Sequence, residues 1–286
     1  MQKIGLISRQ NSDKVREVSN GVSDWLIKQG YDVMLFDDLE KAETDFFVSK
    51  SAEHIPDMII AVGGDGTLLN TARKAAPAGI PILGINMGNL GFLTEVEVDS
   101  VYENLAQVFS GCYVEDSRMM LQADIVREGR LVKRLTGLNE ATIHSGALTL
   151  LGINFWVDID FAGNCKGDGI IIASPTGSTA YSLSAGGPVA HPSLEVFIQT
   201  WICPHTITAR PAVIPADKEC IMELETAPLG ALVTTDGHNG FDLIEKDKVI
   251  IKKAPYKATF IRLAPLKFFS LLKSKLGSEA AMHGLD

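Results

Sequence analysis

The feature that most constrains the fold is the segment Met58–Thr67, which reads MIIAVGGDGT. Its first five residues are apolar, and such a run is typical of a strand buried on both faces of a parallel sheet. Three glycines follow, and a helical pattern begins at Leu68. Glycines at a strand-to-helix turn let a phosphate approach the backbone N–H groups at the start of the helix. The segment therefore predicts an α/β sheet with a phosphate-binding turn.

One carboxylate, Asp65, lies among the glycines of this turn. Because a polyphosphate repels a facing carboxylate, three roles suit this position: a helix cap, a partner of a metal ion or a catalytic base. A glycine turn that contains an aspartate also occurs as a purely structural turn. The turn by itself leaves these interpretations open.

Composition excludes several classes of protein. The chain has 286 residues, of which 46% are hydrophobic and 21% charged, and this suits one or two domains. A net charge of −9 without a Lys/Arg-rich run opposes a nucleic-acid-binding surface. No apolar run reaches the ~18 residues of a membrane span. We therefore expect a cytoplasmic protein that binds neither nucleic acid nor membrane.

The cysteines and histidines do not predict a metal site. The four cysteines are widely spaced and form no CxxC motif, so neither a zinc knuckle nor a disulfide framework is indicated, and a reducing compartment fits. The histidines show no paired ligand spacing. We expect no metal ligands in the chain.

The first hundred residues alternate between strand and helix patterns. Strands are expected at residues 3–8, 31–36, 58–62 and 80–85, helices at 13–29, 67–76 and 99–111, and a short helix within the polar segment 37–56. This alternation predicts a parallel sheet, whose ligands bind beyond the carboxyl ends of the strands. Asp65 and Asn86 both lie at such ends.

From about residue 100 the pattern changes to the period of two that marks antiparallel strands. Helical spacing returns between residues 265 and 277, where we expect a C-terminal helix that packs back on the first domain. The predicted fold class is α/β + β, with a parallel α/β sheet domain at residues 1–99, joined by 265–286, and a β-rich sandwich domain at 100–264. The strands expected in the second domain are 119–127, 131–142, 153–161, 169–173, 205–209, 220–226, 232–236, 249–253 and 257–263.

Residues 166–188 form a second segment of interest, because they are dense in glycine, serine and threonine. After the apolar strand 170–173, Ser178 or Thr179 is placed to cap a short helix whose N–H groups face a ligand. An ordinary capped loop is the other interpretation. The polar pair Asn139–Glu140 interrupts an apolar strand, so it is either exposed at an edge or hydrogen-bonded to a ligand such as a sugar hydroxyl.

Together these segments resemble the bacterial NAD kinase family over nearly the whole chain. The glycine motif is shared with diacylglycerol and sphingosine kinases and, in related form, with phosphofructokinases, so it specifies only the superfamily. The SPTGSTAY run at 174–181 is far more specific. The matching motifs, in order and spacing, are GGDGT at 63–67, NMGNLGFL at 86–93, NE at 139–140, the block 166–188, CPHT at 203–206 and RP at 210–211.

The resemblance implies phosphoryl transfer from ATP or polyphosphate to the 2′-hydroxyl of the adenosine ribose of NAD, which gives NADP. Asp65 would be the base that takes the hydroxyl proton. NAD would lie in the cleft between the two domains, and Mg²⁺ or another divalent cation would arrive with ATP rather than on protein ligands. The positions that the resemblance implies for nucleotide binding are Gly63, Gly64, Gly66, Thr67, Asn86, Phe92, Asn139, Glu140, Lys166, Asp168, Thr176, Thr179, Ala180, Tyr181, Ser182, Leu183, Ser184 and His238.

Three positions depart from the family pattern. Met87 replaces a basic residue, Lys166 stands where many relatives have arginine and so lacks its bidentate fork, and residues 145–152 lack the polar residues that many relatives carry. His238 stands where relatives often have glutamine; both donate hydrogen bonds, but only histidine titrates near neutral pH.

Two other functions compete with this one. A lipid kinase of the same superfamily would need an apolar cleft in place of the hydroxyl-rich segment 166–188. A non-catalytic NADP-binding regulator would bind nucleotide without forming NADP, and retention of Asp65 disfavours it. The expected partners are the small molecules NAD and ATP or polyphosphate, and a second copy of the chain in a dimer or tetramer.

Overall fold

The protein is described by a computed structural model, which covers residues 3–8, 12–36, 46–51, 54–88, 91–146, 149–206 and 208–282. The chain forms two compact units, one of Met1–Ser117 with Thr259–Asp286 and one of Arg118–Ala258. The division falls inside two long strands, β6 (Val114–Arg127) and β17 (Lys248–Arg262). The boundaries expected from the sequence lay instead at residues 99–100 and 264–265.

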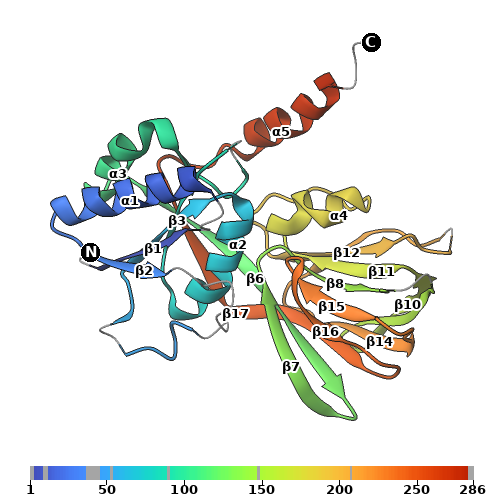
Figure 1. The fold of residues 1–286 in the computed structure, drawn as a ribbon. Coiled ribbons are helices and arrows are strands. Elements are labelled where there is room, and N and C mark those ends of the chain that lie inside the picture. Colours follow the sequence, from blue (N-terminus) through green and yellow to red (C-terminus); the bar gives the residue numbers. More distant parts are fainter. Residues whose placement is uncertain are drawn as a thin grey trace. The chain divides into compact units, whose positions relative to one another are not determined.

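The first unit contains a parallel sheet in the order β2-β1-β3-β4 (Figure 1). Next to β4 lie the short strand β5, through Ile85 and Val96, and the end of β17, through Ile82 and Phe260. The bounds of the elements in this unit, in chain order, are β1 Lys3–Ser8, α1 Asp13–Lys28, β2 Asp32–Phe36, β3 Met58–Gly63, α2 Asp65–Ala75, η3 Ala76–Ala78, β4 Ile82–Asn86, β5 Val96–Glu97, η4 Val98–Ser100, α3 Val101–Phe109 and α5 Phe268–Met282. The parallel α/β sheet predicted from the sequence is confirmed.

Helices cover both faces of this sheet. On β3, Met58, Ile60 and Val62 pack with α1 and α3 in one apolar cluster. On β4, the neighbours of Gly84 belong to the same cluster, so Gly84 points to the opposite face, where a side chain would collide with Leu68 of α2. The continuous apolar runs of β3 and β4 therefore follow from burial on both faces.

The boundaries of the helices in this unit differ slightly from those expected. Helix α2 begins at Asp65, two residues earlier than predicted, directly after Gly64 at its N-cap. Residues 46–49 form a turn, and the rest of the short helix expected at 37–56 lies partly outside the described residues. The expected C-terminal helix is present as α5, within the residues grouped with the first unit. In the described part of the chain, no helix is long and apolar enough to cross a membrane.

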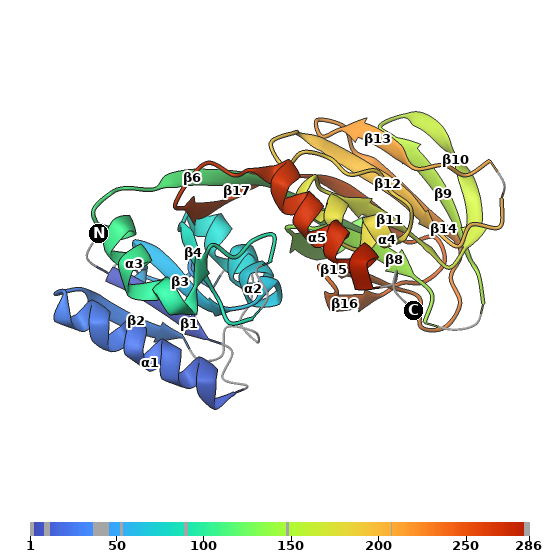
Figure 2. The ribbon, with the colours of Figure 1, turned by 90° about the horizontal axis from the view of Figure 1, so that it is seen from above.

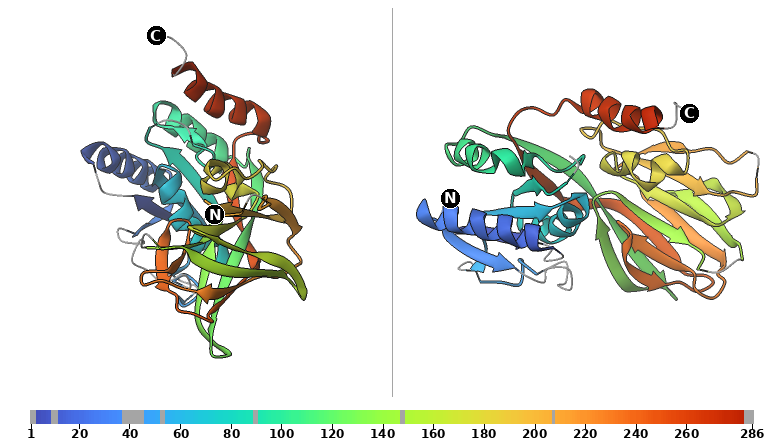
Figure 3. Two further views of the ribbon diagram at one scale, coloured as in Figure 1. Left: turned by 90° about the vertical axis from the view of Figure 1, so that its right-hand side faces the viewer. Right: turned by 45° about the horizontal axis from the view of Figure 1, so that its top comes forward.

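The second unit is a β-sandwich, as predicted (Figures 2 and 3). One layer has the order β13-β12-β11-β8-β15-β16, and the other contains β10-β9-β14-β17 together with the hairpin β6-β7. One apolar cluster joins the inward residues of both layers. The remaining elements of this unit are β7 Arg130–Gly137, β8 Glu140–His144, β9 Leu151–Val157, β10 Asp160–Gly167, β11 Gly169–Ala173, η5 Thr176–Thr179, α4 Tyr181–Ser184, β12 Val196–Ile202, β13 Ala212–Pro215, β14 Cys220–Thr226, β15 Leu232–Thr235 and β16 His238–Asp242.

Strand β11, in the layer that contains β12 and β8, is covered on both of its faces. Its residues Ile170 and Ile172 point into the sandwich, whereas Ile171 and Ala173 pack on the outer side with Ala190 and neighbouring apolar residues. The segment that contains α4 covers this outer face (Figure 1). The residues from 174 to 190 are thereby fixed on a buried strand.

Two predicted strands are each divided by a turn. The strand expected at 131–142 is β7 and β8, and the strand expected at 153–161 is the hairpin β9-β10. Asp158 at this hairpin adopts a positive φ of 53° and Ile159 is fully exposed. The turn reverses the chain there, so Ile159 belongs to neither strand.

Other strands were misplaced. Residues 205–209, expected to form a strand, do not form one where they are described, whereas β12, β13 and β16 were not predicted. The two strands expected at 249–253 and 257–263 are one continuous strand, β17, which runs through Pro255. The β-rich class was therefore predicted more accurately than its individual strands.

Candidate functional site

Asp65 is the first residue of α2 and follows β3 directly, with only Gly64 between them. Its carboxylate does not cap its own helix. It accepts two hydrogen bonds from a neighbouring loop, from Phe92 N–H to Oδ2 at 2.9 Å and from Leu93 N–H to Oδ1 at 3.2 Å. The interpretation of Asp65 as a helix cap was therefore wrong. The carboxylate is instead fixed beside the carboxyl ends of β3 and β4.

The loop that binds Asp65 is also bound by Arg262, a side chain that is only 2% exposed. Its guanidinium donates to the carbonyl oxygens of Phe92, Leu93 and Thr94 at 3.2 to 3.3 Å. It also forms ion pairs with Glu95 at 2.9 Å and with Asp116 at 3.1 Å. The loop thus presents its carbonyl groups to Arg262 and two of its N–H groups to Asp65.

The glycines around Asp65 fall into two groups. A side chain at Gly63 would collide with Thr67, and one at Gly91 would collide with the Asp65 carboxylate. At Gly64 and Gly66, by contrast, a Cβ would meet nothing within 4 Å, and neither residue has a positive φ. Folding therefore explains glycine at 63 and 91, but not at 64 and 66. Their open backbone is where a ligand can come close.

Asn86 ends β4 and is buried. Its side chain folds back on the following turn, because Nδ2 donates to the carbonyl oxygen of Gly88 and Oδ1 accepts from the Gly88 N–H at 3.4 Å. Both polar atoms of the amide thus stabilise the turn. In this structure the side chain shapes the end of the strand.

In the second unit, the Asn139–Glu140 backbone is held by the Asp236 side chain and by the backbone of Ser174. Buried Asp236 accepts from the N–H groups of Leu138 at 3.0 Å, Asn139 at 2.7 Å and Glu140 at 3.4 Å. Ser174 N–H donates to the Asn139 carbonyl oxygen at 2.7 Å. The Asn139 side chain makes no hydrogen bond with the described residues, and so its amide is available to a ligand.

Glu140 is 6% exposed, and its Oε2 is buried without a hydrogen-bond partner among the described residues. Burial raises the pKa of this carboxyl to about 8, and the nearby negative charge of Asp236 adds to the shift. At neutral pH the group is therefore mostly protonated. A protonated carboxyl both donates and accepts hydrogen bonds.

Residues 174–177, within the block 166–188, pack directly on Asn139. A side chain at Gly177 would collide with the Asn139 carbonyl oxygen, and Thr176 accepts from Arg118 at 3.4 Å. Neither η5 nor α4 has a side-chain cap, so the expected capping by Ser178 or Thr179 was wrong. Ser178 instead accepts from Ala190 N–H at 3.0 Å.

The residues of α4 differ in what they offer to a ligand. Tyr181 is 45% exposed, and Thr179, Ala180, Leu183 and Ser184 are at least partly accessible. The hydroxyl of Ser182 is fully buried and lies 3.1 Å from the Thr200 hydroxyl, so it stabilises the packing of α4 on β12. Among the predicted binding residues of this helix, Tyr181 has the largest accessible surface suited to stacking.

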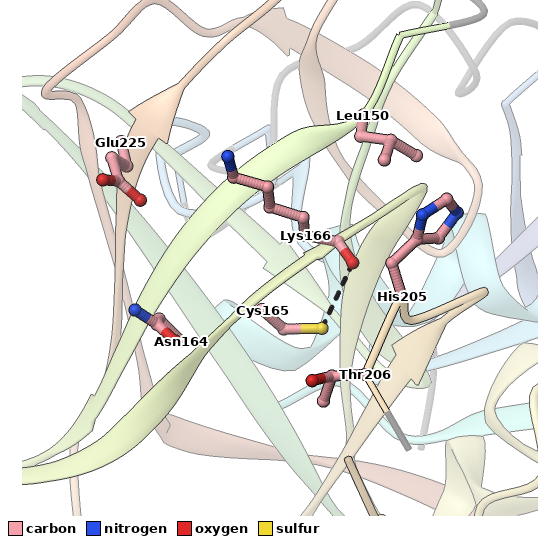
Figure 4. Close-up of a pocket in the computed structure, with 7 residues that line it drawn as sticks. All are labelled: Leu150, Asn164, Cys165, Lys166, His205, Thr206 and Glu225. Carbon is pink, nitrogen blue, oxygen red and sulfur yellow. Dashed lines mark hydrogen bonds between the residues drawn. The ribbon is translucent and has the colours of Figure 1, made fainter. Parts of the chain in front are cut away.

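Lys166 and Asp168 are exposed residues near the junction of β10 and β11. Lys166 lines a pocket of about 330 Å³ together with Cys165, His205 and Glu225 (Figure 4). Asp168 accepts a hydrogen bond from the Cys203 thiol, and this contact raises the pKa of that thiol. His238, at the start of β16, is exposed and pairs in register with Thr235.

The predicted site residues thus form two groups. Gly63, Gly64, Asp65, Gly66, Thr67, Asn86 and Phe92 belong to the first unit, and all the others belong to the second. Within each group the structure brings together segments that are distant in sequence, such as Asp65 with Phe92 and Asn139 with Gly177.

Comparison with known proteins decides the family. The model of the ATP-NAD kinase N-terminal domain matches residues 4–113, and that of the ATP-NAD kinase C-terminal domain matches residues 138–263. The chain belongs to the NAD kinase family. The resemblance read from its motifs is therefore confirmed.

Similar NAD kinases match along nearly their whole length. The NAD kinase of Thermoanaerobacter sp. (strain X514) is 40% identical, with 96% of this chain and 99% of the relative covered. That of Koribacter versatilis is 37% identical, with 96% and 98% covered. The similarity to these relatives is therefore not confined to one of the two domains.

Solved structures of the family share the fold. An NAD kinase from Archaeoglobus fulgidus in complex with ATP has a TM-score of 0.76 at 25% identity, and the match covers 97% of this chain and 99% of the other. Yeast NADH kinase complexed with NADH has a TM-score of 0.85 at 20% identity, and the match covers 97% and 88%. The second similarity concerns the fold alone.

Some residues that shape this NAD kinase site were not predicted. Arg262, Ser174 and Asp236 lie outside the residues proposed to bind nucleotide, yet each holds the backbone of Phe92 or Asn139, and Gly91 leaves the space that the Asp65 carboxylate occupies. The sequence contains one signal for Asp236: an aspartate before glycine favours a turn, and Asp236 has a positive φ of 50°. The sequence contains no such signal for Arg262, because its partners are distant along the chain.

Proposed function

We propose that the chain transfers a phosphoryl group from ATP or polyphosphate to the 2′-hydroxyl of the adenosine ribose of NAD, with Asp65 as the base. One observation carries the proposal: the carboxylate at the start of α2 binds loop N–H groups instead of its own helix. The start of α2, with the open faces of Gly64 and Gly66, is then left for an anionic donor.

The nucleotide acceptor is proposed to bind residues of the second unit. Asn139 has a fixed backbone and an available amide, and Tyr181 has an accessible aromatic face. Glu140 is mostly protonated at neutral pH and can donate to a ribose oxygen. Lys166, Asp168, Thr176, Thr179, Leu183, Ser184 and His238 remain proposed contacts, together with Ala180 and Ser182, of which Ala180 is partly accessible and Ser182 is buried.

Phosphoryl transfer depends mainly on positioning and on neutralisation of phosphate charge. In the described residues, no three His, Cys, Asp or Glu side chains lie together as metal ligands. The chain therefore fits a divalent cation that is held by the phosphates of the donor. When bound there, Mg²⁺ would supply part of the charge neutralisation.

The role of Asp65 is proposed as proton acceptance from the attacking hydroxyl. Each carboxylate oxygen uses one acceptor position for a loop N–H and keeps another available. The loop thereby fixes the direction in which the carboxylate faces. A positioned general base typically contributes ~10²- to 10⁴-fold to the rate.

We also propose a cytoplasmic location and a homo-oligomer. The four cysteines are all free thiols, which suits a reducing compartment. Light scattering after gel filtration would give the oligomeric state, for which a dimer or tetramer is expected.

The proposal is tested by incubating the purified chain with Mg²⁺, either ATP or polyphosphate, and either NAD or NADH. NADP or NADPH should form with at least one pair, and Asp65→Asn should lose roughly 10²-fold or more in turnover. NAD titration and thermal melting of the variant show whether the site is still formed.

Two results would contradict the proposal. Nucleotide binding without product from any pair would indicate a regulator rather than an enzyme. If Asp65→Asn keeps turnover within a few-fold, the base lies elsewhere in the chain.

A further inference from the structure

A cavity of about 380 Å³ lies between the two layers of the second unit. Its walls come from β9 and β10 in one layer, from β12 and β13 in the other, and from residues that connect β12 to β13. None of the residues proposed above for phosphoryl transfer or nucleotide binding lines it. Its volume lies in the range of sites for small organic molecules.

One polar side chain points into this cavity from the buried face of β12. Every second side chain of a strand lies on the same face, so residues 197, 199 and 201 share one face of β12. Phe197 on this face belongs to the apolar core between the layers. Gln199 therefore also points inward, and it lines the cavity while only 3% exposed. Its Nε2 has no hydrogen-bond partner among the described residues. An unpaired buried donor is costly, and few occur in native proteins.

The wall around Gln199 is suited to a planar ring. Phe155 and Trp201 both line the cavity, with ring centroids 6.4 Å apart and planes at 85°. Val157 and Ile214 add aliphatic surface. Aromatic ligands pack well in this edge-to-face environment.

The charges of the lining indicate what kind of polar group such a ring would carry. Among the described residues that line the cavity, Arg210 is the one charged side chain, and none is an aspartate or a glutamate. Asn164 and Thr208 add neutral polar groups. A donor from Gln199 and a cation from Arg210 both favour an acceptor that bears negative charge.

We propose that this cavity binds a small aromatic carboxylate. Its ring lies against Phe155 and Trp201, and its carboxylate accepts a hydrogen bond from Gln199 Nε2. The site is distinct from the proposed phosphoryl-transfer residues and does not depend on the proposed function. The competing explanation is that water alone fills the cavity and satisfies Gln199.

The experiment uses 2-naphthoate as the probe and the full-length chain, with calorimetry as the measurement. We expect saturable binding with a dissociation constant below about 1 mM. Gln199→Leu keeps a similar volume and removes the unpaired donor. It should weaken probe binding at least about tenfold and raise the melting temperature by about 2–4 °C.

A matched control is available at Gln122, which is equally buried but has a paired amide. Its Nε2 donates to both oxygens of Asp124, at 3.0 and 3.1 Å. Gln122→Leu should therefore lower the melting temperature and leave probe binding unchanged. The proposal is overturned if the wild-type chain shows no saturable binding, which would indicate a water-filled cavity only, or if Gln199→Leu binds the probe as tightly as the wild type.

Discussion

A single peptide group joins Arg262 to Asp65. The carbonyl oxygen of Phe92 accepts from Arg262 Nη2 at 3.2 Å, and the N–H of the same peptide group, on Leu93, donates to Asp65 Oδ1 at 3.2 Å. A cation on the carbonyl side strengthens the N–H as a donor, because hydrogen bonds in series polarise one another. Arg262 is therefore expected to position the Asp65 carboxylate without touching it.

Arg262→Lys should lower kcat at least about tenfold, since lysine keeps the charge but cannot reach three carbonyls and two carboxylates at once. Arg134→Lys is the matched control: Arg134 also binds a carboxylate, that of Asp124, through two nitrogens, but it belongs to the second unit and Asp65 to the first. The control should keep kcat within a few-fold. Equal losses of kcat in the two variants, at equal melting temperatures, would remove the positioning role.

The two groups of glycines predict opposite results from the same substitution. Gly66→Ala lies in helix α2 with open space around it, so it should leave stability unchanged or raise it by up to about 0.5 kcal/mol. Its methyl group would nevertheless obstruct a phosphate, and the KM for ATP should rise. Gly91→Ala must displace the Asp65 carboxylate and should lower the melting temperature. Stability curves and ATP kinetics of both variants test this, and an unchanged KM in Gly66→Ala would argue against donor binding there.

The raised pKa of Glu140 predicts that the free energy of unfolding falls as the pH rises. Its folded pKa of about 8 lies above the ordinary glutamate value of 4.5, so its favourable contribution is complete below about pH 4.5 and is lost as the pH approaches 8. Relative to Glu140→Gln, the wild type should lose up to about 1.4 kcal/mol per pH unit in this window. Denaturant unfolding from pH 5.5 to 8 measures the difference.

Glu195 provides the control for this pH dependence. It is partly exposed, and hydrogen bonds from Lys253 and Lys257 lower its pKa to about 2. Glu195→Gln should therefore differ from the wild type by a constant amount between pH 5.5 and 8. A constant difference for Glu140→Gln as well would mean that Glu140 is ionised in the folded chain.

Substitution of Tyr181 or Asn139 by alanine should lower the affinity for NAD without lowering the stability of the fold. Tyr181 is 45% exposed and the Asn139 amide has no partner among the described residues, so replacing either by alanine removes little from the folded chain. The apparent Kd for NAD should rise several-fold in each case. Phe161→Ala, at another exposed aromatic of the same unit, should leave it unchanged. Unchanged NAD titrations in Tyr181→Ala and Asn139→Ala would remove both residues from the site.

The parallel sheet could be predicted from the sequence because its signals are local. The runs in β1, β3 and β4 are continuously apolar, and the helices between them carry clear boundaries such as Ser12 at the N-cap of α1. The sandwich depends on turns whose signals are weak. Asp158 adopts a positive φ without a glycine beside it, and the alternation of β9 continues unbroken into β10. A period of two does not reveal where a strand reverses.

The candidate site shows the same division. The motifs around Asp65 and Asn139 could be recognised because each is continuous in sequence. The residues that fix them could not, since Arg262 lies 170 positions from Phe92 and Asp236 lies 97 positions from Asn139. Only the fold brings such pairs together. Gln199 was missed for another reason: a glutamine and a threonine in the middle of β12 weaken its pattern, although both are buried.

The last prediction concerns Mg²⁺. In the described residues there is no cluster of His, Cys, Asp or Glu that suits a metal ion, and Asp65 already accepts two loop N–H groups. Magnesium keeps several waters and commonly binds through substrate phosphates with one or two carboxylates. Calorimetry of Mg²⁺ into the nucleotide-free chain should therefore show only weak binding, whereas turnover should require Mg²⁺ or a similar divalent ion. If Asp65 instead held the metal directly, the cation would favour its deprotonated form and make it a poorer proton acceptor. A tight nucleotide-free Mg²⁺ site that Asp65→Asn abolishes, but Glu95→Gln does not, would assign Asp65 to the metal and the base to another residue.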